Sequence, residues 1–180
     1  APVIPGIQIA DLTTGLMAVT GILAALLARE RIGRGQYIDV SFLDAVTSLI
    51  VLPAAFYIGE EKSPKRGEWL LNGGFPCYNI YETKDGKYIT IGCLEEQFWT
   101  NLCSALGVMG FVKHQYTSDE AKLREMFQTF REIFKTRTLD EWLKLLLKED
   151  VPCGPVYDLD EVFRDPQILH RKMIIEVEYP

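Results

Sequence analysis

The apolar residues of this chain follow two different patterns, and the change falls about a third of the way along the sequence. Residues 1–58 are apolar almost throughout, and the run from Leu12 to Ala28 carries no charge. A helix that is apolar on every side is buried on every side. The sequence therefore predicts a buried helical segment over residues 11–58 that packs against another chain or another domain, because the residues that follow offer no matching surface.

A polar stretch with glycine and proline separates this segment from the remainder. Residues 59–67, GEEKSPKRG, have the composition of a linker or surface loop. Beyond them, Cys77–Thr83 and Lys87–Leu94 are rich in β-forming residues and flank Asp85-Gly86, a strong hairpin signal. We therefore expect residues 68–180 to form a small α+β domain.

The clearest helix pattern covers residues 117–135, where apolar residues repeat at steps of three and four. Thr117 and Glu120 have the spacing of a capping box at its start. Other helix boundaries are indicated by Gly107 after Glu96–Leu106, by a second capping box of Thr138 and Glu141, and by Asp165-Pro166. Lys172–Tyr179 alternates weakly between apolar and polar residues and predicts a closing strand.

The composition is that of a globular protein without signs of nucleic-acid or metal binding. Hydrophobic residues make up 48% and charged residues 24%, and the net charge is -6 with no clustered basic residues. The four cysteines form no C-x-x-C pair and the two histidines stand apart from them, which argues against a zinc site and a disulfide framework. We therefore expect reduced thiols, a cytoplasmic location and no metal.

Neither a targeting segment nor a membrane segment is indicated. Residues 1–5, APVIP, lack the basic region of a signal peptide. The apolar runs Leu12–Ala28 and Ala45–Gly59 are shorter than the ~20 residues of a membrane span, so we interpret both as core helices.

Three carboxylates stand at positions that suggest a role. Asp11 lies at the start of the most apolar helix, either as its cap or as a nucleophile or acid/base group. Asp44 is a lone charge in an apolar run, and a buried carboxylate there requires a hydrogen-bond partner. Glu95 follows a predicted strand, either as an exposed residue before a helix or as a site residue.

The pair Gly73-Gly74 either permits a close approach of the backbone to a ligand or forms a turn. The sequence carries no P-loop, dinucleotide-binding fingerprint or nucleophile elbow. From the residues alone, we predict a soluble α/β protein with two unusual carboxylates, Asp11 and Asp44.

A series of motifs resembles the class III CoA-transferase family, which includes formyl-CoA transferase, carnitine CoA-transferase and α-methylacyl-CoA racemase. The motifs occur in the family's order and extend over essentially the whole chain. They are Ile9–Gly15, Gly21–Leu26, Arg29, Gly33–Ser41, Leu71–Tyr81, Asp85-Gly86, Gly92–Trp99, Pro152–Val156 and Glu161-Val162.

The resemblance implies roles for individual residues. Asp11 matches the catalytic aspartate, a nucleophile in the transferases and an acid/base group in the racemase. Glu95 matches a glutamate that orients a catalytic histidine in the racemase, and Tyr78 and Asp44 match polar residues near that site. The implied substrate is a coenzyme A thioester, with no covalently bound cofactor.

The resemblance also implies a fold and an assembly. Family members have an α/β fold with a large CoA-binding domain and a small domain, and they form interlocked homodimers. Residues 1–58 are then a helical segment of the large domain, and 68–180 are the small domain. The family's catalytic histidine lies upstream of Asp11, so we expect this chain to lack an N-terminal portion of the enzyme.

Three functions are compatible with these motifs. The residues Gly73, Gly74, Pro76 and Tyr78, together with Glu95, favour the racemase-like branch, which interconverts α-methylacyl-CoA epimers by removing and returning the α-proton. The alternative is a CoA-transferase that works through aspartyl intermediates. A third possibility is a non-catalytic fragment with a structural or assembly role.

Overall fold

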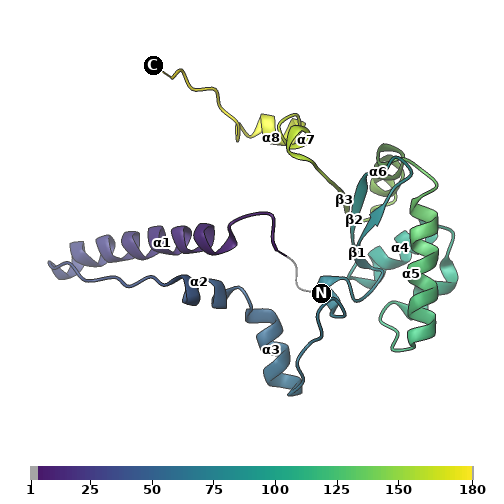
Figure 1. Cartoon of the computed structure of the whole chain (residues 1–180), viewed down its shortest axis with the longest axis horizontal. Coiled ribbons are helices and arrows are strands. Elements are labelled where there is room, and N and C mark those ends of the chain that lie inside the picture. The colour runs from purple at the N-terminus through teal and green to yellow at the C-terminus, as the bar shows by residue number, and fades with distance from the viewer. Residues whose placement is uncertain (1–3, 180) are drawn as a thin grey trace. The chain divides into compact units, whose positions relative to one another are not determined.

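A computed structural model describes residues 4–179 and divides the chain into two compact units, with the boundary between Arg66 and Gly67. The first unit is helical, and the second combines helices with a small antiparallel sheet (Figure 1). The described residues therefore form an α+β arrangement, and no parallel sheet occurs within residues 4–179.

The first unit contains the helices α1 (Ile9–Ile32), α2 (Phe42–Ser48) and α3 (Val51–Glu60). Helix α1 ends at Gly33, whose φ of 75° lets its N–H donate to the Arg29 carbonyl at 2.8 Å. The helix packs against the segment that returns beside it, since a Cβ at Gly21 would lie 3.3 Å from Ile38 Cγ2. Helix α3 continues through Glu60, two residues into the predicted linker.

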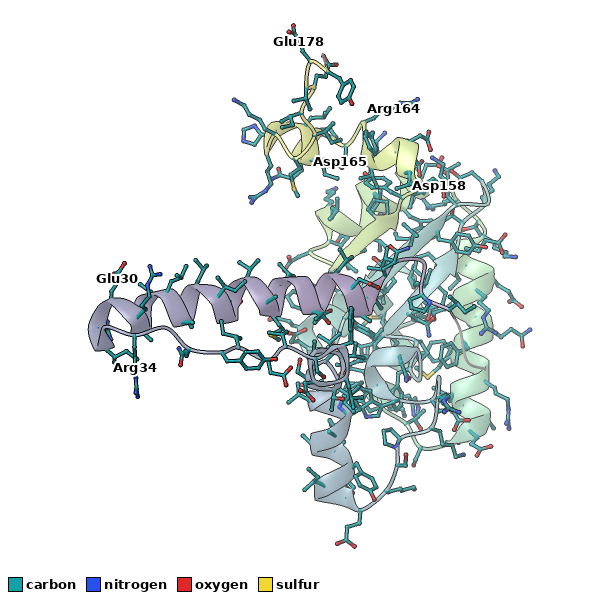
Figure 2. All side chains as sticks on the ribbon, turned by 60° about the vertical axis from the view of Figure 1, so that its left-hand side comes forward. Glu30, Arg34, Asp158, Arg164, Asp165 and Glu178 are labelled. Carbon is teal, nitrogen blue, oxygen red and sulfur yellow. The ribbon has the colours of Figure 1, made fainter. Side chains whose placement is uncertain are left out.

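The helices of the first unit bury little of their apolar surface. Neither α1 nor α3 contains a buried residue, and Ala45 in α2 is the buried residue of this unit among those described. Leu16 is 71% exposed and Leu27 is 64% exposed. The charges gather at the far end of α1, where Glu30 and Arg34 point away from the helix (Figure 2). The predicted burial of this segment is therefore not provided by its own helices.

Helix α1 is longer than the uncharged run suggested. Its 24 residues are long and apolar enough to cross a membrane by length and composition, and α2 with α3 passes the same test as a pair bent by 65°. A core helix of a soluble protein meets this criterion too. The helix length inferred from the uncharged run was therefore too short. The absence of a membrane span stays a prediction.

The second unit is built on a three-stranded antiparallel sheet in the order β1-β2-β3. Its strands are β1 (Tyr78–Glu82), β2 (Tyr88–Gly92) and β3 (Cys153–Val156). The hairpin predicted at Asp85-Gly86 is confirmed, with Tyr78 opposite Gly92 and Glu82 opposite Tyr88. Asp85 Oδ1 accepts hydrogen bonds from the Thr83 hydroxyl at 2.6 Å and from the Leu139 N–H at 3.2 Å.

The core of this unit lies between one face of the sheet and three helices. These are α4 (Glu96–Ala105), α5 (Glu120–Phe134) and α6 (Leu139–Lys148), and Figure 1 shows α5 running alongside the sheet. Tyr81 stacks on Phe134 at 4.7 Å between ring centroids, and Trp99 stacks on Phe130 at 5.6 Å. Side chains alternate across a strand, so Ile80, Tyr88 and Val156 remain exposed on the opposite face.

Some helix boundaries confirm the predicted signals and others correct them. Thr138 and Glu141 form the predicted capping box, and Asp165 caps α8 (Pro166–His170) with proline in its first turn (Figure 2). The cap of α5 is Asp119, which accepts from the N–H groups of Ala121 and Lys122, so the predicted Thr117–Glu120 box is wrong. Asp119 is the cap in place of Thr117 because its carboxylate accepts hydrogen bonds from two N–H groups at the helix start.

The third strand lies elsewhere than predicted. Residues 172–179 form no strand, and β3 instead comprises Cys153–Val156. A strand needs a partner for its backbone groups, and β3 obtains one by pairing Gly154 with Thr90. The remaining elements of the unit are the 3-10 turns Leu70–Asn72 and Met109–His114 and the helix α7 (Leu159–Val162).

Candidate active site

Asp11 lies in the first turn of α1, three positions inside the helix. The N-cap is Gln8, so the interpretation of Asp11 as the cap is wrong. The side chain is exposed and makes no hydrogen bond or ion pair with residues 4–179. The positive end of the helix dipole stabilises a carboxylate at this position. Both carboxylate oxygens are therefore open to a ligand.

Asp44 lies in the first turn of α2, where its backbone N–H donates to Ser41 Oγ at 3.0 Å. Its side chain is exposed, which corrects the expectation of a buried carboxylate with a partner. With Ser41 and Asp39, it lines a hollow of about 310 Å³ within the first unit. The residue thus takes no part in holding the core of this unit.

Glu95 occupies the N-cap position of α4 without capping it, and its side chain is exposed. The chain just before it is held firmly. Gln115 Nε2 donates to the Cys93 carbonyl at 3.0 Å and to the Leu94 carbonyl at 2.9 Å, and the Tyr116 hydroxyl also donates to Leu94. Gln115 is buried and was not singled out by the sequence, because a glutamine in a short turn carries no motif.

Gly73 and Tyr78 line the same hollow of about 620 Å³, on the exposed face of the sheet. Thr90 of β2 and Gly154 of β3 contribute to it as well. Gly73 has a φ of 94°, and its carbonyl accepts from Asn79 Nδ2 at 2.9 Å. Within the second unit, the structure thus brings these two predicted site residues together.

Gly74 serves the turn itself. A Cβ there would lie 2.6 Å from the backbone carbon and oxygen of Glu68 and 2.7 Å from the Trp69 oxygen. Its N–H donates to the Trp69 carbonyl at 2.9 Å. The close approach that glycine permits is therefore to the chain's own backbone, which favours the turn over a ligand contact.

The four cysteines are structural groups. Cys77, Cys93 and Cys103 are fully buried, and all four thiols are free. Burial raises the pKa of Cys93 to about 12 and that of Cys153 to about 11. A thiol that stays protonated is a poor nucleophile. Within residues 4–179, no group of histidine, cysteine, aspartate and glutamate could hold a metal ion.

The predicted site residues are divided between the two units. Asp11 and Asp44 belong to the first, and Gly73, Tyr78 and Glu95 belong to the second. The first unit supplies an open carboxylate at a helix start, and the second supplies a hollow beside a glycine turn.

Comparison with known proteins covers the whole sequence. Residues 1–180 match the profile of a family described as CoA-transferase family III. The chain is 31% identical over 184 residues to the succinyl-CoA:glutarate CoA-transferase of Homo sapiens, covering 99% of this chain and 41% of that protein. It is 31% identical over 204 residues to the formyl-CoA:oxalate CoA-transferase of Escherichia coli O157:H7 (strain EC4115 / EHEC), covering 99% of this chain and 49% of that one. The chain therefore spans less than half the length of these curated relatives.

Solved structures agree with these matches. A CAIB/BAIF family protein from Brucella suis superposes with a TM-score of 0.77 and 30% identity over 97% of this chain and 47% of that chain. Rv3272 from Mycobacterium tuberculosis superposes with a TM-score of 0.75 and 23% identity over 98% of this chain and 47% of its own, a likeness of fold alone.

Proposed function

This chain belongs to CoA-transferase family III, and from that premise we propose that the protein moves CoA between carboxylic acids with Asp11 as its nucleophile. The observation that carries this proposal is the Asp11 carboxylate in the first turn of α1, which is exposed and has no partner among residues 4–179. The two curated relatives described above are both named CoA-transferases. Their names support CoA transfer ahead of the epimerisation that the Gly73-Gly74 motif favours.

In the proposed reaction, an Asp11 oxygen attacks the carbonyl carbon of an acyl-CoA thioester. The C–S bond breaks, which releases the CoA thiolate and leaves a mixed anhydride on Asp11. The thiolate then attacks the Asp11 carbonyl carbon, expels the donor carboxylate and forms an aspartyl-CoA thioester. An acceptor carboxylate reverses the two steps, leaving as the new acyl-CoA and restoring the Asp11 carboxylate.

Replacing the nucleophile tests this reaction. In the protein of native length, Asp11→Asn should lower CoA exchange by ~10³-fold or more, because an amide neither attacks nor leaves as a carboxylate does. Hydroxylamine added with acyl-CoA should convert Asp11 of the unaltered protein into a hydroxamate that peptide mass spectrometry locates. Glu30→Gln, at an exposed carboxylate on the same helix, is the matched control and should retain exchange. Near-normal exchange in Asp11→Asn would refute the nucleophile.

Epimerisation is the second candidate, and the carbonyls fixed by Gln115 just before Glu95 favour it. A glutamate on a rigid turn is suited to orient an acid/base group. Incubation with a 2-methylacyl-CoA in deuterated water should then exchange the α-proton without forming a hydroxamate. Glu95→Gln should lower this exchange strongly, whereas CoA transfer through Asp11 should change little. If neither reaction occurs in the native-length protein, a non-catalytic role is favoured.

We further propose that two copies assemble into a homodimer in the cytoplasm. Leu16 and Leu27 are representative of the apolar side chains that α1 leaves exposed, and such surfaces are unusual on soluble monomers. Light scattering on the native-length protein should give the mass of two chains, and a monodisperse monomer would overturn this part of the proposal.

A further inference from the structure

The hollow on the exposed face of the sheet is formed entirely within the second unit. Its floor is a row of cross-strand neighbours on the exposed face of the sheet. In this row Ile80 pairs with Thr90, and Thr90 pairs with Gly154. Their neighbours Tyr81 and Ile89 point the other way and are buried in the core. The volume of about 620 Å³ lies in the range of small-molecule sites.

Every described residue that lines this hollow is uncharged at neutral pH. The apolar residues of the lining include Leu71, Ile80 and Pro152. Transfer of an unpaired carboxylate or ammonium group from water into such surroundings is costly. The hollow therefore favours a ligand group without charge.

Most polar side chains around the hollow are already engaged with the protein. Asn79 donates to the Gly73 carbonyl at 2.9 Å, and its Oδ1 accepts from the Ile80 N–H at 2.9 Å. The Thr90 hydroxyl donates to the Gly154 carbonyl at 3.0 Å, and Asn72 Oδ1 accepts from the Trp69 N–H at 2.8 Å. The Asn79 and Thr90 side chains therefore act as walls, because each already donates a hydrogen bond within the protein.

We propose that this hollow binds the hydrocarbon part of an uncharged acyl group carried as a CoA thioester. The inference rests on the proposed function, since it names the substrate class of that reaction. The two curated relatives are named for succinyl and glutarate and for formyl and oxalate. A dicarboxylic acyl group would place its second carboxylate in the hollow without a counter-charge, so this protein selects a monocarboxylic, apolar acyl group.

Two glycines leave the floor open. Neither Gly92 nor Gly154 has the left-handed backbone that requires glycine. A Cβ at Gly92 would lie 3.9 Å from the Pro152 oxygen, and one at Gly154 would lie 3.5 Å from Thr90 Oγ1, both ordinary contacts. Larger residues fit the backbone at both positions, and their side chains would fill the hollow.

The test compares binding of acetyl-CoA, hexanoyl-CoA and glutaryl-CoA by titration calorimetry in the native-length protein. The CoA part is common to all three, so the ratios of Kd isolate the acyl group. A buried methylene is worth about fourfold in Kd. We therefore expect hexanoyl-CoA to bind at least about tenfold more tightly than acetyl-CoA or glutaryl-CoA. Gly92→Leu should reduce this preference to about threefold or less.

Gly110→Leu is the matched control, since Gly110 lies outside the hollow with nothing within 4 Å of an added Cβ, and it should keep the preference. If Gly92→Leu fails to fold by circular dichroism, Gly92→Ala and Gly154→Ala should still weaken hexanoyl-CoA binding, each by at least about twofold.

The result that overturns the inference is an unchanged preference in the folded Gly92 variants, or tight binding of glutaryl-CoA, or no binding of hexanoyl-CoA. The proposed function fails separately. A protein that binds hexanoyl-CoA through this hollow but forms no hydroxamate at Asp11 would retain the acyl site and lose the transfer reaction.

Discussion

Both units are rich in apolar residues but use them in opposite ways. Helix α1 is apolar on every side and buries none of its residues. Helix α5 carries its apolar residues on one face and buries Met126, Phe130 and Phe134. The comparison teaches that the spacing of apolar residues, more than their number, decides whether a segment forms its own core.

The two units therefore differ in whether they are stabilised by a core of their own. The aromatic cluster around Phe130 makes the second unit a self-contained core, with ring contacts to Tyr81, Trp99, Phe111 and Phe134. In the first unit, side chains such as Leu16 have no comparable neighbours. Core substitutions should therefore act strongly in one unit and weakly in the other.

The sharpest way to break the comparison is to truncate one apolar side chain in each unit. Phe130→Ala should lower the free energy of unfolding of the 180-residue chain by about 3–5 kcal/mol, because the cavity it leaves is fully enclosed. Leu16→Ala removes a side chain that is 71% exposed and should cost less than about 0.5 kcal/mol. Urea unfolding followed by far-UV circular dichroism, which reports the helices of both units, measures both, and equal losses would contradict the comparison.

A smaller loss of stability is expected at Gly74, which lies against the backbone of Glu68 and Trp69. Gly74→Ala should destabilise the second unit by about 1–3 kcal/mol, because its Cβ would lie 2.6 Å from the Glu68 carbonyl and the turn must shift. Gly110→Ala, where nothing lies within 4 Å, should change the unfolding free energy by less than about 0.5 kcal/mol. Thermal melts of the two variants measure this difference in stability. A Gly74→Ala variant as stable as the unaltered protein would show that the turn accommodates a Cβ.

The smallest expected effect is that of the cysteine thiols on the free energy of unfolding. All four thiols lie in the second unit, and their effect increases at alkaline pH. Burial raises the pKa of Cys77 to about 11 and of Cys103 to about 12, above the ordinary value of 9.0. The folded state thus holds these protons more tightly than the unfolded state. Their contribution is complete below pH 9 and is lost progressively as the pH rises from 9 through 11 to 12.

Urea unfolding at pH 8 and pH 10.5 should therefore show lower stability at the higher pH. Cys103→Ala removes one titrating group and should make this decline less steep. A decline that is equally steep in the variant would assign it to groups other than this thiol.

Local signals in the sequence anticipated much of the second unit. The hairpin, the helix α4 and the caps at Thr138 and Asp165 each depend on residues within a few positions of one another. Strand β3 escaped prediction because Gly154 and Pro155 are poor strand formers and its partner lies far away in sequence. The predicted strand at 172–179 failed for the converse reason, since alternation alone supplies no partner.

The candidate site was anticipated in residue identity but not in geometry. The family motif named Asp11, Glu95, Gly73 and Tyr78, yet only packing shows that Gly73 and Tyr78 line one hollow. The role of Gln115 in fixing the carbonyls before Glu95 depends on a contact across 22 positions of sequence. Such contacts come from tertiary structure and leave no periodic signal.

The pairing of β2 with β3 has a consequence for how the chain is made. The Thr90 hydroxyl donates to a carbonyl 64 positions later, at Gly154. Ribosomes add about 5–20 residues per second, so roughly 3–13 s separate the synthesis of these two partners. During that interval the nascent hairpin has β2 without its second neighbour. An open strand edge is a template for another chain, so crowded polysomes expose this unit to strand exchange before its own third strand arrives.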